Sequence, residues 1–209
     1  MSAREAILQR IRSAQPHAVV PEVERIIANP VRGPQPAPVI DLVSCFTEQA
    51  QSLSSTVLRV RNRSDVPHVI AHYLTEHDLE NSALCWPDLL DLDWIASRMV
   101  VAAQAACPED SVGITGAFCA IAETGTLMLL SGVHTPAATS LLPETHIAVL
   151  DTVRIVATME DAWDALRREH GSLPRAVNFV SGPSRTADIE QTVTLGAHGP
   201  ARVLIVLVG

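Results

Sequence analysis

From residue 40 onward, short apolar segments alternate with amphipathic ones, and this alternation constrains the fold more than any other feature of the chain. The apolar segments have the length and β-branched content of strands, and the amphipathic segments have helical spacing. The expected strands are residues 56–60, 82–86, 99–103, 112–114, 126–131, 146–150, 154–157, 176–180 and 203–208. The expected helices are residues 41–54, 64–77, 89–96 and 159–170. This order predicts an α/β fold with a mostly parallel sheet flanked by helices.

The composition agrees with such a sheet and limits the partners of the chain. Hydrophobic residues make up 47% of the 209 residues and aromatic residues only 3%, so aliphatic side chains must fill the core. Aliphatic, β-branched cores are typical of parallel sheets covered by helices. The formal net charge of −8 argues against nucleic acid or an anionic membrane as the main partner, because both attract basic surfaces.

The four cysteines are widely spaced, and no C-x-x-C pair occurs among Cys45, Cys85, Cys107 and Cys119. We therefore expect no structural zinc site, no iron–sulfur cluster and no other metal in this chain. The sequence shows no signal peptide and no run of about 18 uncharged apolar residues. The chain is accordingly expected to be cytoplasmic and to lack a membrane span.

The N-terminal part differs in character from the rest. Residues 2–14 have the spacing of an amphipathic helix, and six prolines follow between residues 16 and 38. The sequence thus predicts an N-terminal helix with a proline-rich arm over residues 1–38 and an α/β domain over residues 39–209.

The first candidate site is residues 181–190, which follow the apolar segment 176–180, expected to be a buried strand. Open α/β sheets place ligand sites in loops that follow core strands. Hydroxyls, a guanidinium and backbone N–H groups freed by glycine suit a carboxylate or phosphate. The ligand-binding candidates are Ser181, Gly182, Ser184, Arg185, Thr186 and Asp188. The alternative is a capped turn in which Asp188 and Glu190 begin a helix.

The second candidate is the segment around Glu123, the only charged residue between Asp110 and Glu144. A carboxylate in such apolar surroundings needs a partner or has a raised pKa, so Glu123 is a candidate catalytic base or nucleophile. The next residues, Thr124, Gly125 and Thr126, form a turn that could hold an anion or be purely structural. Neither the dinucleotide-binding fingerprint nor the phosphate-binding P-loop motif occurs.

The third candidate is His198, which lies among glycines just before the last expected strand. A loop histidine can act as an acid or base, although a plain turn is the alternative. His134 and His146 flank another polar segment, but local sequence does not favour either as a site residue. The chain also lacks the G-x-S-x-G signature of a serine nucleophile.

Four segments occur in a characteristic order and together resemble the lactate utilisation protein C family, which is built on the LUD domain. They are residues 122–126, 140–147, 181–190 and 196–200. The resemblance extends over about residues 40–209. It implies a fold like that of the ribose-phosphate isomerase, glucosamine-phosphate deaminase and CoA-transferase group.

The resemblance also implies a role in oxidising L-lactate to pyruvate together with two iron–sulfur partner proteins. The clusters would belong to those partners, and this chain would bind or position something else. From the chemistry of its loops we expect a small anionic ligand, with the positive charge supplied by Arg185 or by an arginine elsewhere in the fold. Two alternatives stay open. One is a stand-alone sugar-phosphate isomerase-like or acyl-transfer enzyme that uses Glu123. The other is a non-catalytic assembly or regulatory module that contacts partners through residues 1–38.

Overall fold

The computed structural model describes residues 3–14, 38–107, 109–187, 193–196 and 198–209, and the chain divides into two units, Met1–Ala37 and Pro38–Gly209. In the first unit, α1 (Ala3–Ala14) forms the expected N-terminal helix. It exposes the apolar side chains of Ile7, Leu8 and Ile11 along one face. All other elements of the described residues belong to the second unit.

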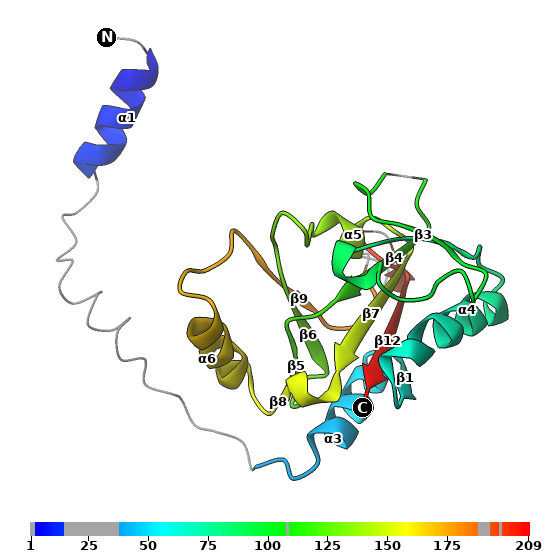
Figure 1. The fold of residues 1–209 in the computed structure, drawn as a ribbon. Coiled ribbons are helices and arrows are strands. Elements are labelled where there is room, and N and C mark those ends of the chain that lie inside the picture. Colours follow the sequence, from blue (N-terminus) through cyan, green and yellow to red (C-terminus); the bar gives the residue numbers. More distant parts are fainter. Residues whose placement is uncertain (1–2, 15–37, 108, 188–192, 197) are drawn as a thin grey trace. The chain divides into compact units, whose positions relative to one another are not determined.

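A six-stranded, wholly parallel sheet forms the centre of the second unit (Figure 1). Its strands, in spatial order, are β1 (Thr56–Val60), β12 (Arg202–Val208), β7 (Thr145–Asp151), β4 (Val112–Gly116), β2 (Ser82–Cys85) and β3 (Val100–Ala102). This confirms the α/β prediction. Because every strand runs the same way, all strands begin at one edge, here called the amino edge, and end at the other, the carboxyl edge.

Both faces of the large sheet are buried. The helix α4 (Val66–Glu76) packs on one face, where Ile70 meets Leu204 and Val206 of β12 in one apolar cluster. On the other face, α3 (Leu42–Ser52) brings Phe46 against Ile205 in a second cluster. A central strand buried on both sides explains why 203–208 is an unbroken apolar run rather than an alternating one.

A smaller, four-stranded sheet lies beside α3 over the second face. Its spatial order is β8 (Ile155–Val156), β5 (Cys119–Ile121), β6 (Thr126–Leu130) and β9 (Val177–Val180). Alternate residues of β6 face opposite ways, so that Leu127 joins the cluster of Phe46 and Met128 packs against α6 (Met159–Glu169). The small sheet is therefore enclosed between the large sheet and α6.

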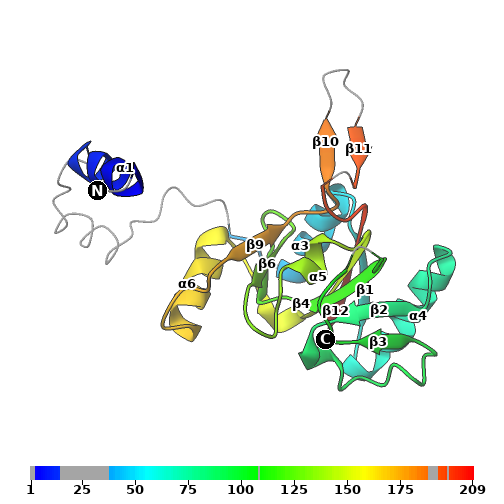
Figure 2. The ribbon, with the colours of Figure 1, turned by 90° about the horizontal axis from the view of Figure 1, so that it is seen from above.

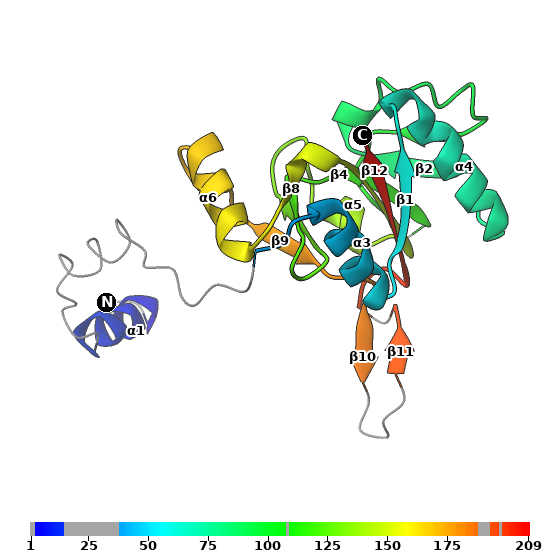
Figure 3. The ribbon, with the colours of Figure 1, turned by 90° about the horizontal axis from the view of Figure 1, so that it is seen from below.

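The remaining elements are short. They are the 3-10 turns η1 (Arg63–Asp65), η2 (Pro87–Leu89) and η3 (Thr152–Arg154), the helix α5 (Ala138–Leu141), and the strands β10 (Arg185–Ala187) and β11 (Val193–Leu195). The last two pair only with each other, as an antiparallel ribbon that projects from the body of the unit (Figures 2 and 3).

Two expectations for individual elements are wrong. The segment 176–180 is not a buried strand of the parallel sheet, because β9 is the antiparallel edge of the small sheet and leaves Phe179 39% exposed. The expected helix over 89–96 is also absent from this described part of the chain. There the Trp94 indole donates to the Leu89 carbonyl at 2.8 Å, which holds a succession of tight turns around a buried ring.

Candidate functional site

The four segments that were singled out in the sequence lie close together in the structure. The Thr126 and Ser181 hydroxyls are 2.7 Å apart, which joins the segment 122–126 to the segment after β9. The Ser184 N–H donates to the Pro200 carbonyl at 2.8 Å, which joins that segment to the loop before β12. Thus hydroxyls and backbone groups far apart in the sequence form one connected region.

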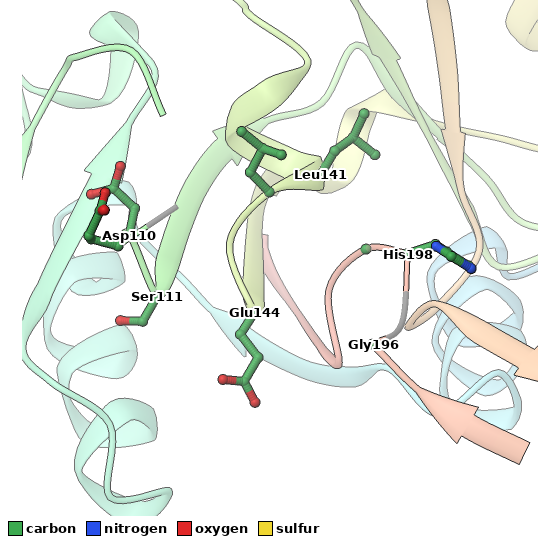
Figure 4. Close-up of a pocket in the computed structure, with 9 residues that line it drawn as sticks. Asp110, Ser111, Leu141, Glu144, Gly196 and His198 are labelled. Atoms are coloured by element: carbon green, nitrogen blue, oxygen red, sulfur yellow. The ribbon is translucent and has the colours of Figure 1, made fainter. Parts of the chain in front are cut away.

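This region includes a pocket of about 480 Å³ at the amino edge, here called the amino-edge pocket (Figure 4). Ser111 precedes β4 and Glu144 precedes β7, and both stand where parallel strands begin. Its lining residues are Glu109, Asp110, Ser111, Leu141, Leu142, Glu144, Gly196, His198 and Gly199. The segment 181–190 was expected to follow a buried core strand, but it follows β9, which is the edge strand of the small sheet.

The charges around the amino-edge pocket are mainly negative. Glu144 accepts from the Arg202 guanidinium at 3.0 Å, and Asp110 accepts from the backbone N–H of Cys107 at 2.8 Å. The same Asp110 carboxylate accepts from the Cys107 thiol and raises the thiol pKa. His198 is exposed, and its ring points away from Asp110 and Glu144 in Figure 4. The pocket therefore presents acceptors more than it presents positive charge.

Arg185 does not line this pocket. Its guanidinium donates to the Leu53 carbonyl at 3.1 Å and to the Ser54 hydroxyl, both in the turn between α3 and β1. Ser54 has a φ of 70°, a conformation that non-glycine residues rarely adopt. The contacts of Arg185 thus hold an unusual turn, which a sequence motif for anion binding could not reveal.

Of the other ligand-binding candidates in this segment, Ser184 adjoins the amino-edge pocket, Thr186 lies on a strand, and Asp188 lies outside the described residues. Ser184 lies against Gly199, where an added Cβ would be 3.3 Å from the Ser184 Cβ, so Ser184 adjoins the amino-edge pocket. Thr186 is the middle residue of β10 and pairs with Thr194 of β11.

Gly125 and Gly182 both approach the end of α3. A Cβ on Gly125 would lie 2.4 Å from the Ala50 nitrogen, and a Cβ on Gly182 would lie 2.3 Å from the Leu53 carbonyl oxygen. Their φ angles are +63° and +79°, which favour glycine. These glycines therefore permit close packing against the helix, a role that does not require a ligand.

Glu123 has a backbone partner in the structure. One carboxylate oxygen accepts from the Met159 N–H at 2.8 Å, at the start of α6. A carboxylate there also interacts favourably with the positive end of the helix dipole. The first turn of α6 is thus the hydrogen-bond partner that a carboxylate in apolar surroundings needs. The next residue, Thr124, is exposed.

His146 is a buried group that local sequence could not select. It is fully buried on β7, and its Nε2 lies 2.8 Å from the Thr115 hydroxyl on β4. Burial lowers the pKa of the imidazole to about 4, so His146 is neutral near pH 7. Its Nδ1 and the Thr139 hydroxyl have no hydrogen-bond partner among the described residues. Only the neighbouring strand and α5 create this environment, so no sequence signal marks it.

The described ranges contain no group of three or more His, Cys, Asp or Glu side chains that could hold a metal ion. Among the described helices, none is both long enough and apolar enough to cross a membrane.

Comparison with known proteins relates this arrangement to other chains. A family model for the LUD domain matches residues 108–208. An uncharacterized protein of Neisseria meningitidis serogroup B is 40% identical over 96 residues, which cover 46% of this chain and 41% of that protein. Lactate utilization protein C of Bacillus velezensis is 34% identical over 128 residues, covering 59% and 53%. The matches thus span about half the length of these relatives.

A longer match and a solved structure extend the comparison. Lactate utilization protein C of Exiguobacterium sp. is 33% identical over 171 residues, covering 80% of this chain and 71% of that protein. The crystal structure of a DUF162 family protein from Deinococcus radiodurans has a TM-score of 0.61 at 23% identity. It aligns with 83% of this chain and 100% of its own, and it supports the α/β fold.

Proposed function

The chain belongs to the lactate utilization protein C family, and from that premise we propose that it is the subunit without iron–sulfur clusters in an assembly that oxidises L-lactate to pyruvate. Two iron–sulfur proteins are its proposed partners and receive the electrons released from lactate. The proposed role includes the binding of a small anionic ligand for the assembly, with hydroxyl and backbone N–H groups rather than arginine as the donors of the amino-edge pocket.

The convergence of the four segments is the observation that carries this proposal. Their members are up to 78 residues apart, from residue 122 to residue 200, yet hydrogen bonds link them: Thr126 to Ser181 and Ser184 to Pro200. The segments 140–147 and 196–200 line the amino-edge pocket itself, and Ser184 adjoins it. Binding sites are commonly carried by such loops at the ends of strands. In the proposed site, Ser111 and Ser184 offer hydroxyl donors, and His198 is an exposed lining residue.

The cysteine spacing motivates the proposed division between the subunits. No C-x-x-C pair occurs in the sequence, whereas iron–sulfur clusters are held by several closely placed cysteine thiolates. The proposal therefore assigns the redox centres to the partners.

The test is lactate-dependent dye reduction by the two purified iron–sulfur partners, with and without the full chain. We expect reduction only when all three proteins are present. Equal rates from the two partners alone would exclude a required subunit and would favour a regulatory role.

A variant of the pocket extends this test. His198 is exposed, so His198→Ala should leave the fold intact and lower lactate-dependent reduction by about tenfold, as expected for the loss of one hydrogen bond to a charged ligand. The control is His68→Ala, which removes an exposed histidine from α4, an element outside the amino-edge pocket. Equal activity of the two variants would remove His198 from the site.

The alternative of a stand-alone isomerase-like or acyl-transfer enzyme depends on Glu123 as base or nucleophile. In the structure this carboxylate accepts the Met159 N–H and lies outside the amino-edge pocket. A group engaged in this way is less available to abstract a proton from a substrate. The geometry therefore favours the subunit role over this enzyme.

A further inference from the structure

A second cleft lies at the carboxyl edge of the large sheet, here called the carboxyl-edge cleft. It consists of two adjoining hollows of about 300 Å³ and 440 Å³. Both are lined by Asp88, Gly116, Ala117 and Phe118, so these four residues form their shared wall. None of the lining residues belongs to the amino-edge pocket.

The position of this cleft is the one at which parallel sheets usually bind ligands. After β2 the chain continues to β3 on one side, and after β4 it continues to β7 on the other, although β2 and β4 are neighbours. The loops that follow two such strands diverge and leave a crevice at their carboxyl ends. Asp88 follows β2 and Ala117 follows β4, so both line this crevice.

The smaller hollow contains two guanidinium groups that are held in place by backbone carbonyls. Arg63 donates to the Asp88 carbonyl at 3.1 Å, and Arg154 donates to the Phe118 carbonyl at 2.8 Å. Each arginine is thereby fixed to one of the two diverging loops. Their side chains are 41% and 34% exposed, so solvent and ligand can reach them.

Four carboxylates stand near these two arginines and limit the ligand. Glu169 accepts two hydrogen bonds from Arg154, and Asp91 lies 3.9 Å from Arg63. The carboxylates of Asp88 and Asp151 also line the hollow. A dianion such as phosphate would face these carboxylates as well as the arginines. These side chains suit a ligand with one carboxylate and one hydrogen-bond donor. The carboxylate would accept from a guanidinium, and the donor would donate to the Asp88 carboxylate.

The larger hollow is mainly apolar. Trp86, Phe118, Leu130 and Pro174 contribute to its wall, and a few hydroxyls and the imidazole of His170 complete it. An apolar cavity with a few polar groups is typical of small-molecule sites. At about 440 Å³ it has room for a side chain much larger than a methyl group.

We propose that the carboxyl-edge cleft binds a 2-hydroxy acid with an apolar side chain larger than that of lactate. The carboxylate lies at Arg63 and Arg154, the hydroxyl donates to Asp88, and the side chain lies against Trp86 and Phe118. This inference rests on the proposed function, because the family's role in lactate use favours a hydroxyl over an ammonium group as the donor.

Calorimetric titration of the full chain with 3-phenyllactate tests the proposal. We expect saturable binding that is at least about tenfold tighter than that of L-lactate and is lost with the methyl ester, which has no carboxylate. Tighter binding of phenylalanine or phenethylamine than of phenyllactate would show that the carboxylates select an ammonium group, and would overturn the assignment. Absence of saturable phenyllactate binding would overturn it as well.

Two variants place the ligand in the cleft. Arg63→Ala should weaken phenyllactate binding by about tenfold, whereas Arg61→Ala removes a neighbouring charge that does not line the cleft and should have no effect. In Gly116→Val, the Cβ would lie 3.6 Å from an Asp88 oxygen and 3.8 Å from the Trp86 ring, which are ordinary contacts. The valine methyl groups should therefore fill the space beside the shared wall and prevent phenyllactate from binding. The chain should stay folded, as judged from its melting temperature.

Binding that survives both Arg63→Ala and Gly116→Val would place the ligand elsewhere and overturn the proposal. The proposed subunit role is tested independently of this binding proposal. A chain that binds phenyllactate but is dispensable for dye reduction would contradict only that role. A chain that is required for dye reduction but does not bind phenyllactate would contradict only the present inference.

Discussion

At the scale of single residues, the glycines of the segments 122–126 and 181–190 and Arg185 have packing roles that are not evident from the sequence motifs. Gly125 and Gly182 bring two loops against the end of α3, and Arg185 is hydrogen-bonded to the turn that follows this helix. Glycine-rich polar loops are often interpreted as anion cradles. Here the lack of a side chain is required by neighbouring backbone atoms.

Gly125→Ala and Gly182→Ala should each reduce the free energy of unfolding by more than about 3 kcal/mol, measured by urea denaturation. Each methyl would be placed within 2.5 Å of the backbone of α3 or its following turn, on a residue with positive φ. The control is Gly171→Ala, where no atom lies within 4 Å of the added methyl. It should change the free energy by less than about 1 kcal/mol. Equally small losses at all three glycines would contradict this packing role.

At the scale of elements, α6 shows how a local signal and a distant residue combine. A capping box begins this helix, with the hydroxyl of Thr158 accepting the Asp161 N–H at 3.2 Å and the Asp161 side chain accepting the Thr158 N–H at 3.2 Å. Glu123 comes from the turn between β5 and β6 and accepts the N–H of Met159. The start of this helix thus ties the small sheet to α6.

Thr158→Ala should reduce the free energy of unfolding by about 1 kcal/mol, because it removes the side-chain acceptor at the helix start. Glu123→Ala should have a similar effect, whereas Glu123→Gln keeps an acceptor oxygen and should cost less than about 0.5 kcal/mol. Urea denaturation measures all three variants. The glutamine variant should also support lactate-dependent dye reduction at the normal rate. A folded Glu123→Gln chain without activity would instead assign the carboxylate a chemical role.

At the scale of the whole molecule, the amino-edge pocket and the carboxyl-edge cleft lie at opposite edges of one parallel sheet, and His146, a fully buried histidine, lies within that sheet. His146 stands on the central strand β7, hydrogen-bonded to Thr115 on β4 and shielded from solvent. Protonation of this imidazole would place an uncompensated charge in the core. The stability of the entire fold is therefore linked to pH through one side chain.

The free energy of unfolding should fall as the pH drops from 6.5 towards 4. The pKa of His146 is about 4 when folded and 6.5 when unfolded, so in this window the unfolded chain binds a proton that the folded chain does not. The expected loss at pH 5 relative to pH 7 is about 2 kcal/mol. Urea denaturation at both pH values measures it.

The matched comparison is His146→Gln, which should show a smaller difference between pH 7 and pH 5 whatever its absolute stability. Asp41 and Glu169, whose pKa values are lowered by hydrogen bonds from Ser44 and Arg154, lose stabilisation mainly below their ordinary values of 3.8 and 4.5. The interval above pH 5 therefore reports chiefly on the histidine. A stability that is constant across that interval would contradict the assigned cause.

The sequence by itself determined the elements of the large sheet, the capping box of α6 and the family to which the chain belongs. These features depend on local periodicity, on side chains within one helical turn and on short motifs. Only the tertiary structure decided which sheet β9 joins and which of the four segments line the amino-edge pocket, namely 140–147 and 196–200. It also decided that Arg185 meets Leu53, 132 residues away, and that Glu123 meets α6. Such partners follow from strand order, which is set by the packing of the entire core and not by any local pattern.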